Sequence, residues 1–145
     1  MKTAFTVGFV FDESLSRVLL MRKARPDWQK GKLNGVGGHM EAGETPKECM
    51  VREFGEEVEG SGVAGANERW MEFADMGGTK WSVVCFVSVG DIDNMRGKGD
   101  EPTEVVAVSE LATRTDLLGN IPWLVHLAKD SLMDTGPSYS FINYP

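Results

Sequence analysis

Cysteine and long apolar runs are scarce in this sequence, and their scarcity excludes several protein classes. The two cysteines, Cys49 and Cys85, are too few for a disulfide framework, and no zinc-binding spacing is present. Both lie in apolar stretches, so we expect buried free thiols. No run approaches the roughly 18 apolar residues of a transmembrane helix, and the N-terminus lacks the apolar core and cleavage site of a signal peptide. We therefore expect a soluble cytoplasmic protein with no membrane partner.

Positive charge is also in short supply. The chain has 15 Lys and Arg residues against 22 Asp and Glu residues, which gives a net charge of -7. Because proteins bind nucleic acid largely by neutralising phosphates with Lys and Arg, this balance argues against a long nucleic-acid partner. It does not exclude a small phosphate ligand that binds together with a divalent cation.

The composition and the order of elements indicate one α+β domain. The chain has 145 residues, of which 41% are hydrophobic, enough for a packed core. Two apolar runs separated by turn residues, Phe5–Phe11 and Val18–Met21, predict a β-hairpin. Three further strands are expected at Arg69–Met76, Lys80–Gly90 (central) and Glu104–Val108. Helices are expected at Pro46–Val58 and Pro122–Met133, with a helical turn from Ser109 and loops at Arg25–Lys32 and Asp91–Glu101. The tail from Asp134 is expected to be coil, in which Phe141 and Ile142 are available to dock on the core. Strands and helices do not alternate regularly, so the sheet should be mixed.

The helix expected from Pro46 has a well-marked start and two distinct faces. Thr45 and Glu48 have the spacing of a capping box, and Pro46 takes the first helical position. At helical periodicity one face is apolar and should pack on the sheet; it consists of Met50, Val51, Phe54 and Val58. A second face gathers three carboxylates, those of Glu53, Glu56 and Glu57.

The acidic face has two interpretations. Like charges at these spacings repel one another, and carboxylates near a helix C-terminus oppose the helix dipole. A solvated surface tolerates that cost. Alternatively, a divalent cation makes the cluster favourable, because Mg²⁺ is held by one or two carboxylates together with water and substrate phosphates.

The residues just before this helix fit the second interpretation. Gly37 and Gly38 allow the backbone to approach a bound group closely. Glu44 lies near the helix start, where the helix dipole favours a carboxylate. A purely structural, cap-like role is the alternative for this residue. Arg52 lies between the two faces and can brace neighbouring carboxylates through bidentate hydrogen bonds.

At this segment the chain resembles the Nudix hydrolases. Their box is a Gly, five residues, a Glu, seven residues, Arg-Glu, an apolar residue, any residue, Glu-Glu, any residue and a Gly. This sequence supplies, in that register, Gly38, Glu44, Arg52, Glu53, Phe54, Glu56 and Glu57. It departs from the box at Glu59, where the family usually has Gly, and a glycine follows as Gly60. We expect the helix exit to be displaced by one residue and the preceding metal positions to be retained.

The resemblance implies a single Nudix domain over residues 1–145, with the box at 38–60, folded as an α/β/α sandwich around a mixed sheet. It implies metal-dependent hydrolysis of a nucleoside diphosphate linked to another group, with Mg²⁺ or Mn²⁺ as cofactor. Four residues match the metal-binding positions, namely Glu53, Glu56, Glu57 and Gly38, and two match supporting positions, namely Glu44 and Arg52. The general base in such enzymes is a box glutamate or a residue of a later loop. Glu101 and Glu104 are candidates for the later position, and solvated loop charges are the alternative.

The segment from Trp28 to Gly38 resembles the Nudix branch that hydrolyses oxidised purine nucleoside triphosphates. In that branch an Asn before the glycines contacts the base edge, and Asn34 matches it; an amide offers both a donor and an acceptor to a purine. Trp28 lies near the position of an aromatic residue that stacks on the base. The segment Asn120-Ile121-Pro122-Trp123 resembles the other base-contacting segment of that branch, and Asn120 is our candidate there. The branch can carry acidic residues at this place, where this chain has Gly119 and Asn120.

The resemblance therefore implies hydrolysis of a nucleoside triphosphate, with an oxidised purine as one candidate, to a nucleoside monophosphate and pyrophosphate. Two alternatives stay open: hydrolysis of ADP-ribose or a nucleotide sugar, and a regulatory module that holds a nucleotide without cleaving it. The expected partner is a small nucleotide. Many relatives form homodimers, and the sequence does not decide whether this chain does.

Overall fold

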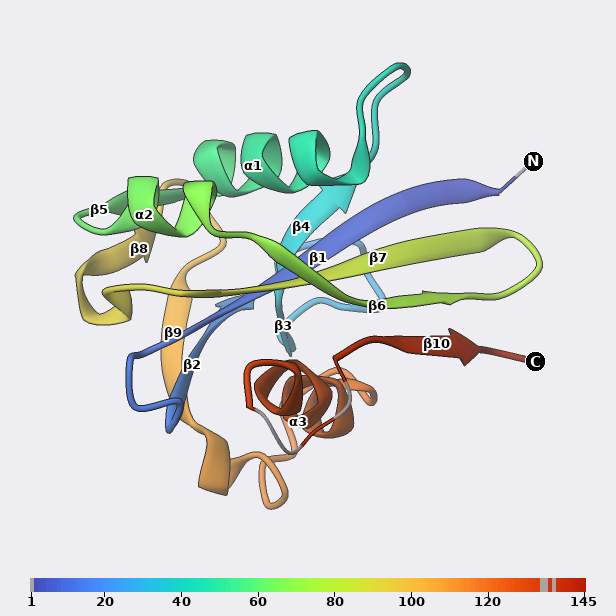
Figure 1. Ribbon diagram of the computed structural model, residues 1–145. Helices are drawn as coiled ribbons and strands as arrows, with labels where there is room; N and C mark the ends of the chain where they lie inside the picture. The colour runs from blue at the N-terminus through green and yellow to red at the C-terminus, as the bar shows by residue number, and fades with distance from the viewer. Residues whose placement is uncertain (1, 134–135, 137) are drawn as a thin grey trace.

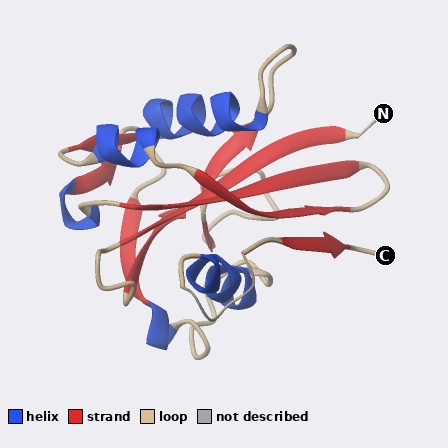
Figure 2. Ribbon diagram, in the orientation of Figure 1, coloured by secondary structure: helices blue, strands red, loops and turns tan. Residues whose placement is uncertain are grey.

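The computed structural model describes residues 2–133, 136 and 138–145, and shows a mixed β-sheet between two helical layers (Figures 1 and 2). Its strands are β1 (Thr3–Phe11), β2 (Arg17–Arg22), β3 (Leu33–Asn34), β4 (Val36–His39), β5 (Val58–Gly60), β6 (Met71–Gly77), β7 (Trp81–Val89), β8 (Met95–Gly97), β9 (Thr103–Ala107) and β10 (Ser140–Asn143). Its helices are α1 (Pro46–Glu57), α2 (Val63–Glu68) and α3 (Ile121–Ser131), with 3-10 turns at Ile92–Asn94 and Val108–Glu110. The α+β class with an α/β/α arrangement is confirmed.

The main sheet is organised around β1. Its strand order is β10-β6-β7-β1-β2-β3, with β4 paired to β1 and β9 paired to β2. The pairing of β1 with β7 is parallel over the full length of both strands, from Thr3 opposite Trp81 to Phe11 opposite Val89. The pairings of β1 with β2 and with β4 are antiparallel, so the predicted first hairpin is confirmed. The expected central position of β7 is confirmed by its place between β6 and β1.

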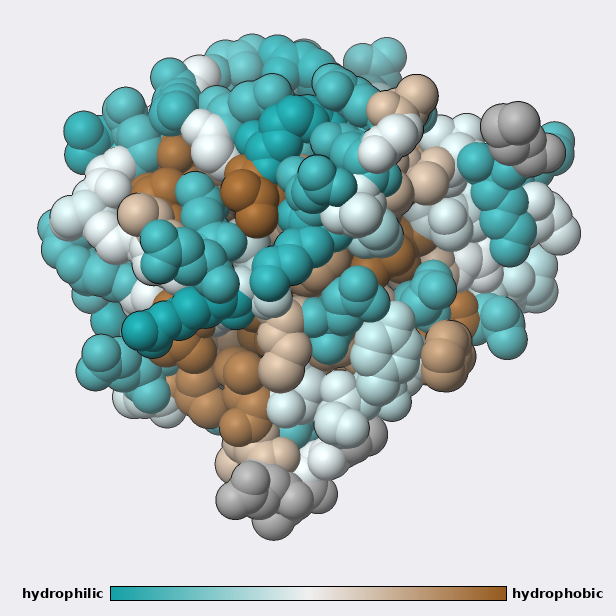
Figure 3. Space-filling view, turned by 45° about the horizontal axis from the view of Figure 1, so that its top comes forward, coloured by the Kyte–Doolittle hydropathy of each residue, from teal (hydrophilic) through white to brown (hydrophobic). Residues whose placement is uncertain are grey.

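Each face of the sheet carries its own hydrophobic core. The helices α1 and α2 cover one face, and α3 covers the other (Figure 1). Under α1, the buried side chains include Met50, Phe54, Val58, Trp70 and Phe86. Under α3, they include Phe9, Phe11, Leu33, Phe73 and Leu124. Figure 3 shows hydrophilic residues over the α1 layer, with hydrophobic ones in patches between them. No helix of the described residues is long and apolar enough to span a membrane.

The start of α1 is built as the sequence predicts. Thr45 accepts a hydrogen bond from the Glu48 backbone N–H at 3.1 Å, and Glu48 accepts one from the Thr45 N–H at 2.9 Å. The helix ends at Glu57, and Val58 is its C-terminal cap. The positive φ of +121° falls at Gly60, where a β-carbon would overlap the carbonyl oxygen of Asn94. The glycine requirement therefore lies one position later than in the family box, and only after the helix has ended.

Two expectations for the later part of the chain need correction, and two elements were not predicted. The segment 91–101 is not only a loop, because it contains a 3-10 turn and the strand β8, which pairs with β5. The helix α2 and the strand β5 carried no clear periodic signal. The tail is not only coil, because β10 pairs in parallel with β6. Ile142 packs on the core as expected, whereas Phe141 is 80% exposed. Residues 134, 135 and 137 lie outside the described residues.

Candidate active site

The most strongly bonded part of the site is the pair formed by Glu44 and Arg52. The guanidinium of Arg52 donates to both carboxylate oxygens of Glu44, at 3.0 Å and 2.7 Å. This bidentate geometry is the strongest form of such a pair. The hydrogen bonds from Arg52 lower the pKa of Glu44 to about 2. Glu44 is therefore ionised and held in place, which matches the bracing contact expected from the sequence.

Arg52 also reaches the acidic face of α1 and the neighbouring strand. It donates to Glu53 Oε1 at 2.9 Å, to Glu56 Oε2 at 3.4 Å and to the backbone carbonyl of His39 at 3.1 Å. One side chain thus ties the loop before α1, the helix itself and the end of β4. The Glu53 side chain is 13% exposed and that of Glu56 is 59% exposed, so Arg52 holds an inner and an outer carboxylate.

The two glycines of β4 allow three elements to approach closely. A β-carbon on Gly38 would lie 2.5 Å from the carboxyl carbon of Glu53, and one on Gly37 would overlap the carbonyl oxygen of Thr6 in β1. Any other residue at either position would push α1 or β1 away. The absence of side chains at these positions therefore places the Glu53 carboxylate directly against the Gly38 backbone.

Glu57 of the acidic face is partly buried, and one oxygen of its carboxylate is shielded from solvent. Its Oε2 has no hydrogen-bond partner among the described residues. Burial raises the pKa of Glu57 to about 7; the charge of Lys23 opposes the shift, and Glu53, Glu101 and Glu56 add to it. A buried carboxylate oxygen without a partner is unfavourable unless something absent from the bare chain compensates it. A divalent cation at this oxygen would do so.

The donors around Glu57 fit a magnesium or manganese ion. The described residues contain no group of three or more His, Cys, Asp or Glu side chains already converged on one point. Mg²⁺ does not require such a group, because it commonly keeps several waters and takes one or two carboxylates plus substrate phosphates. Two carboxylates supply hard oxygen donors of that kind. One is Glu57, whose Oε2 has no partner among the described residues, and the other is Glu53, which lies against Gly38.

Glu101 lies next to this face but has its own partners. Its side chain is buried; Oε1 accepts from Lys23 Nζ at 3.0 Å, and Oε2 accepts from the Ala24 N–H at 2.7 Å. Burial acts to raise the pKa of Glu101, but these hydrogen bonds outweigh it and the net shift is downward. Glu104 points elsewhere and bonds to Arg22 and Arg114. Of the two later-loop candidates, only Glu101 lies at the acidic face.

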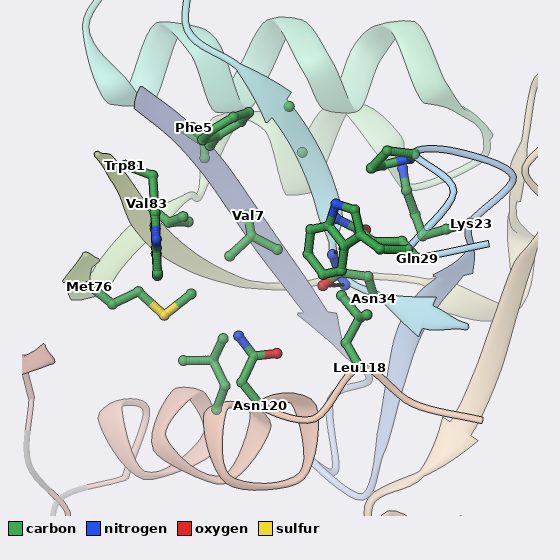
Figure 4. A pocket seen from close by; sticks show the side chains of 17 residues that line it. Phe5, Val7, Lys23, Gln29, Asn34, Met76, Trp81, Val83, Leu118 and Asn120 are labelled. Atoms are coloured by element: carbon green, nitrogen blue, oxygen red, sulfur yellow. Dashed lines mark hydrogen bonds between the residues drawn. The ribbon is translucent and has the colours of Figure 1, made fainter. Parts of the chain in front are cut away.

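A cavity of about 510 Å³ opens beside the glycines of β4, within the size range of small-molecule sites. It contains all five residues expected to bind substrate, namely Trp28, Asn34, Gly37, Gly38 and Asn120. Figure 4 shows Val7 of β1 at its centre, with Trp81, Val83 and Met76 on one side and Gln29, Asn34 and Lys23 on the other. Leu118 and Asn120 close it from the segment that leads into α3 (Figure 4).

The two asparagines in the cavity differ in how far their hydrogen bonds are used. Asn34 accepts from the Gly35 N–H at 2.8 Å and donates to Gln29 Oε1 at 3.2 Å, which fixes its orientation. Asn120 Oδ1 is buried and has no partner among the described residues. Trp28 lines the cavity but is 69% exposed. The cavity thus offers one oriented amide, one unused acceptor and one exposed aromatic ring.

Several residues of the cavity were not predicted from the sequence. Lys23 directly follows the apolar strand β2, but nothing in the local sequence distinguishes it from a surface lysine at a strand end. Met76, Val83 and Leu118 carry no local signal, because an apolar residue of a strand or loop looks the same whether it faces the core or a cavity. Their role depends on the pairing of β6 with β7 and on the path of the chain into α3.

Comparisons with known proteins identify the family and the fold of the chain. A model of the NUDIX domain family matches residues 2–130. Among solved structures, a MutT protein from work on Aliivibrio salmonicida and Vibrio cholerae is 21% identical, with a TM-score of 0.68 over 88% of this chain and 98% of that chain. A NUDIX hydrolase from Nitrosomonas europaea is 17% identical, with a TM-score of 0.69 over 99% and 78% of the two chains. A MutT protein from Bacillus halodurans is 17% identical, with a TM-score of 0.64 over 98% and 90%. The TM-scores show a shared fold at low identity. The family match over residues 2–130 shows that the chain belongs to the Nudix hydrolase family.

Proposed function

We propose that this Nudix hydrolase cleaves a nucleoside triphosphate, with an oxidised purine as candidate base, to a nucleoside monophosphate and pyrophosphate. One observation carries the proposal. A single cavity lined by Asn34 and Asn120 reaches Gly37 and Gly38, and the Glu53 carboxylate lies against Gly38. A base held by the amides would therefore direct its phosphates toward the acidic face of α1.

The metal site of the proposal consists of the carboxylates of Glu53, Glu56 and Glu57 and the carbonyl oxygen of Gly38. Bound there, Mg²⁺ or Mn²⁺ supplies charge neutralisation on the phosphate oxygens and lowers the pKa of an attacking water. The unpartnered oxygen of Glu57 supports this assignment. Arg52 and Glu44 keep the carboxylates oriented through the bonds described above, which reduces the reorganisation needed when phosphate arrives.

The proton of the attacking water goes, in this proposal, to a glutamate of the acidic face. A carboxylate held close to the attacking water can accept that proton by general-base catalysis. Glu101 has a different role, because both its oxygens already accept hydrogen bonds and its pKa is lowered. We assign Glu101 to holding the Lys23 ammonium at the edge of the cavity, facing the incoming phosphates.

In the cavity, the proposal is that Asn34 and Asn120 form hydrogen bonds to the edge of the base and that Trp28 stacks on one of its faces. Asn120 Oδ1 suits a base edge that donates a hydrogen bond, because the oxygen has no other partner. The partner is then a small nucleotide. A cytoplasmic location belongs to the same proposal, and homodimer formation stays a prediction.

A substrate panel tests the proposal. Purified protein with Mg²⁺ is incubated with ordinary and oxidised purine triphosphates, pyrimidine triphosphates, ADP-ribose and nucleotide sugars, and the release of pyrophosphate or monophosphate is measured. We expect pyrophosphate from purine triphosphates above the others. Turnover restricted to ADP-ribose or nucleotide sugars would replace the substrate class. Tight nucleotide binding without turnover of any compound would identify a binding module instead.

A further inference from the structure

Arg22 joins two walls of the cavity without lying in its lining. It is the last residue of β2. Its Nη1 donates to the carbonyl oxygen of Gly31 at 3.0 Å, and its Nη2 donates to Glu104 Oε1 at 2.8 Å and Asp116 Oδ2 at 3.1 Å. Its side chain is 31% exposed, so these bonds are partly shielded from water. One guanidinium therefore contacts three segments that are far apart in the sequence.

Two of these segments carry the residues that we assign to the nucleobase. Gly31 ends the loop that holds Trp28 and Gln29, and its own N–H donates to the Lys23 carbonyl at 2.8 Å. Asp116 directly precedes the segment that holds Leu118 and Asn120.

The backbone joins the second of these walls to β3. The Leu33 N–H donates to the Asp116 carbonyl at 2.8 Å, and the Leu118 N–H donates to the Leu33 carbonyl at 3.1 Å. Leu33 immediately precedes Asn34. The position of Asp116 therefore sets where Asn120 lies relative to Asn34.

Arg114 completes a closed cluster with the same carboxylates. It donates to both oxygens of Asp116, at 2.9 Å and 2.7 Å, and lies 2.8 Å from Glu104 Oε2. Two guanidinium groups thus face two carboxylates, and each carboxylate contacts both arginines. Bidentate networks of this kind hold their members in a defined geometry, whereas isolated surface pairs contribute little.

We propose that Arg22 is a positioning residue for the nucleobase: through Gly31 and Asp116 it fixes the separation between the Trp28 loop and the Asn120 segment. This inference rests on the proposed function for its consequence in catalysis. The positioning role requires a group that donates to several acceptors at once; the planar guanidinium of arginine does so, and the ammonium of lysine does not in the same geometry. The acidic face of α1 is not part of the cluster, so chemistry at the phosphates should be spared.

The opposite end of the same strand provides a matched control. Arg17, the first residue of β2, donates to Asp12 at 3.1 Å and to both oxygens of Asp93, at 2.8 Å and 2.9 Å. Like Arg22, it joins carboxylates from two other segments. Neither Asp12 nor Asp93 lines the cavity that contains Asn34 and Asn120. The substitution Arg17→Lys therefore makes the same chemical change as Arg22→Lys, at a carboxylate cluster that does not border the cavity.

Steady-state kinetics provide the first test. For Arg22→Lys we expect KM for a purine nucleoside triphosphate to rise about tenfold while kcat stays within about twofold, because ground-state positioning is lost and the transition-state contacts are kept. For Arg17→Lys we expect neither constant to change. A fall in kcat at constant KM, or equal effects of the two substitutions, would overturn the inference.

Amide hydrogen exchange provides a second test that needs no activity. In Arg22→Lys we expect the amides of Gly31 and Leu118 to exchange about tenfold faster than in wild type, because local opening of both walls becomes easier. The amide of Cys85 in β7, and all three amides in Arg17→Lys, should keep wild-type rates. Unchanged exchange rates at Gly31 and Leu118 would refute the proposal that Arg22 holds the two cavity walls together. A wild-type protein without triphosphate turnover refutes the proposed function instead, and the exchange rates then still decide whether Arg22 holds the walls.

Discussion

The two ends of the proposed site, which we assign to the phosphates and to the nucleoside, are built from different kinds of residue. At the phosphate end, four charged side chains of one helix, Arg52, Glu53, Glu56 and Glu57, act with Glu44 from the adjoining loop, and Arg52 bonds to three of the glutamates. At the nucleoside end, neutral amides and apolar side chains are collected from β1, β3, β6, β7, the Trp28 loop and the segment before α3. The first end is charged and local, whereas the second is uncharged apart from Lys23 at its edge and is assembled from segments far apart in the chain.

This difference suggests that α1 and the cavity have separate functions, cation binding and selection of the base. A helix gives fixed side-chain spacing at little cost, so the groups that hold a cation can keep one geometry for any substrate. Loops and strand ends vary more easily, so they suit the choice of base. If this division is right, substitutions at the helix should abolish turnover regardless of the base, and substitutions in the cavity should change preference.

The largest effect is expected at the helix. For Glu57→Gln we expect kcat to fall about a thousandfold on every substrate, because the charge at the proposed metal site is lost. The melting temperature should stay at or slightly above that of wild type, because glutamine keeps the shape and removes a buried charge. Pyrophosphate release and calorimetry measure the two quantities.

Glu59→Gln is the matched control for this charge change. Glu59 lies in β5, beyond the end of α1, and pairs with Arg96 at 3.3 Å. Its substitution should leave kcat unchanged. Near-full activity of Glu57→Gln would show that the acidic face is only a solvated surface.

The second effect concerns protons at the same helix. Burial raises the pKa of Glu57 to about 7, above the value in an unfolded chain. The folded state therefore favours the protonated form, and the stability contributed by this group is present at acidic pH and lost as pH rises through about 7. A bound cation competes with the same proton, so metal affinity should change in the opposite direction.

From these signs we expect the affinity for Mn²⁺ to rise about tenfold between about pH 6 and pH 8, as Glu57 deprotonates. Titration of Mn²⁺ followed by electron paramagnetic resonance measures it. In Glu57→Gln the affinity should be lower and nearly independent of pH over this range. A wild-type affinity that does not vary with pH would separate Glu57 from the metal.

The same contrast explains how much could be predicted from the sequence. The capping box at Thr45 and Glu48 and the apolar and acidic faces of α1 depend on residues within one short segment. Periodicity and capping rules read such a segment directly. The first hairpin and the central strand β7 were predicted for a similar reason, since each is a continuous apolar run bounded by turn residues.

Features that depend on distant partners were not predictable in this way. The strand β5 is too short to show a pattern and exists because Gly60 approaches Asn94 and pairs with Met95 of β8. The strand β10 exists because β6 offers it a free edge. The half-buried Lys23 pairs with Glu101, which is far along the chain, at 3.0 Å. In each case the decisive contact lies outside any local window.

The third effect addresses the choice of base. For Asn120→Leu we expect the preference for purine over pyrimidine triphosphates, measured as the ratio of kcat/KM values, to fall about fivefold, the value of one lost hydrogen bond. The kcat for the preferred substrate should change little, because Asn120 is remote from the acidic face. Uniform loss across all nucleotides would show that Asn120 supports the fold of the cavity and does not read the base.

The smallest effect is expected at Trp28, and it tests how far the nucleoside end is completed only by the ligand. Its side chain is 69% exposed, so the free protein gains little from its packing, and the ring is available to a base. Stacking on an exposed ring contributes modestly, so Trp28→Ala should raise KM for purine triphosphates about threefold at unchanged kcat. Trp123→Ala is the matched control, because Trp123 of α3 is 39% exposed and does not line the cavity. Equal effects of the two substitutions would mean that Trp28 is an ordinary surface aromatic, and that the base is held from its edge by the amides alone.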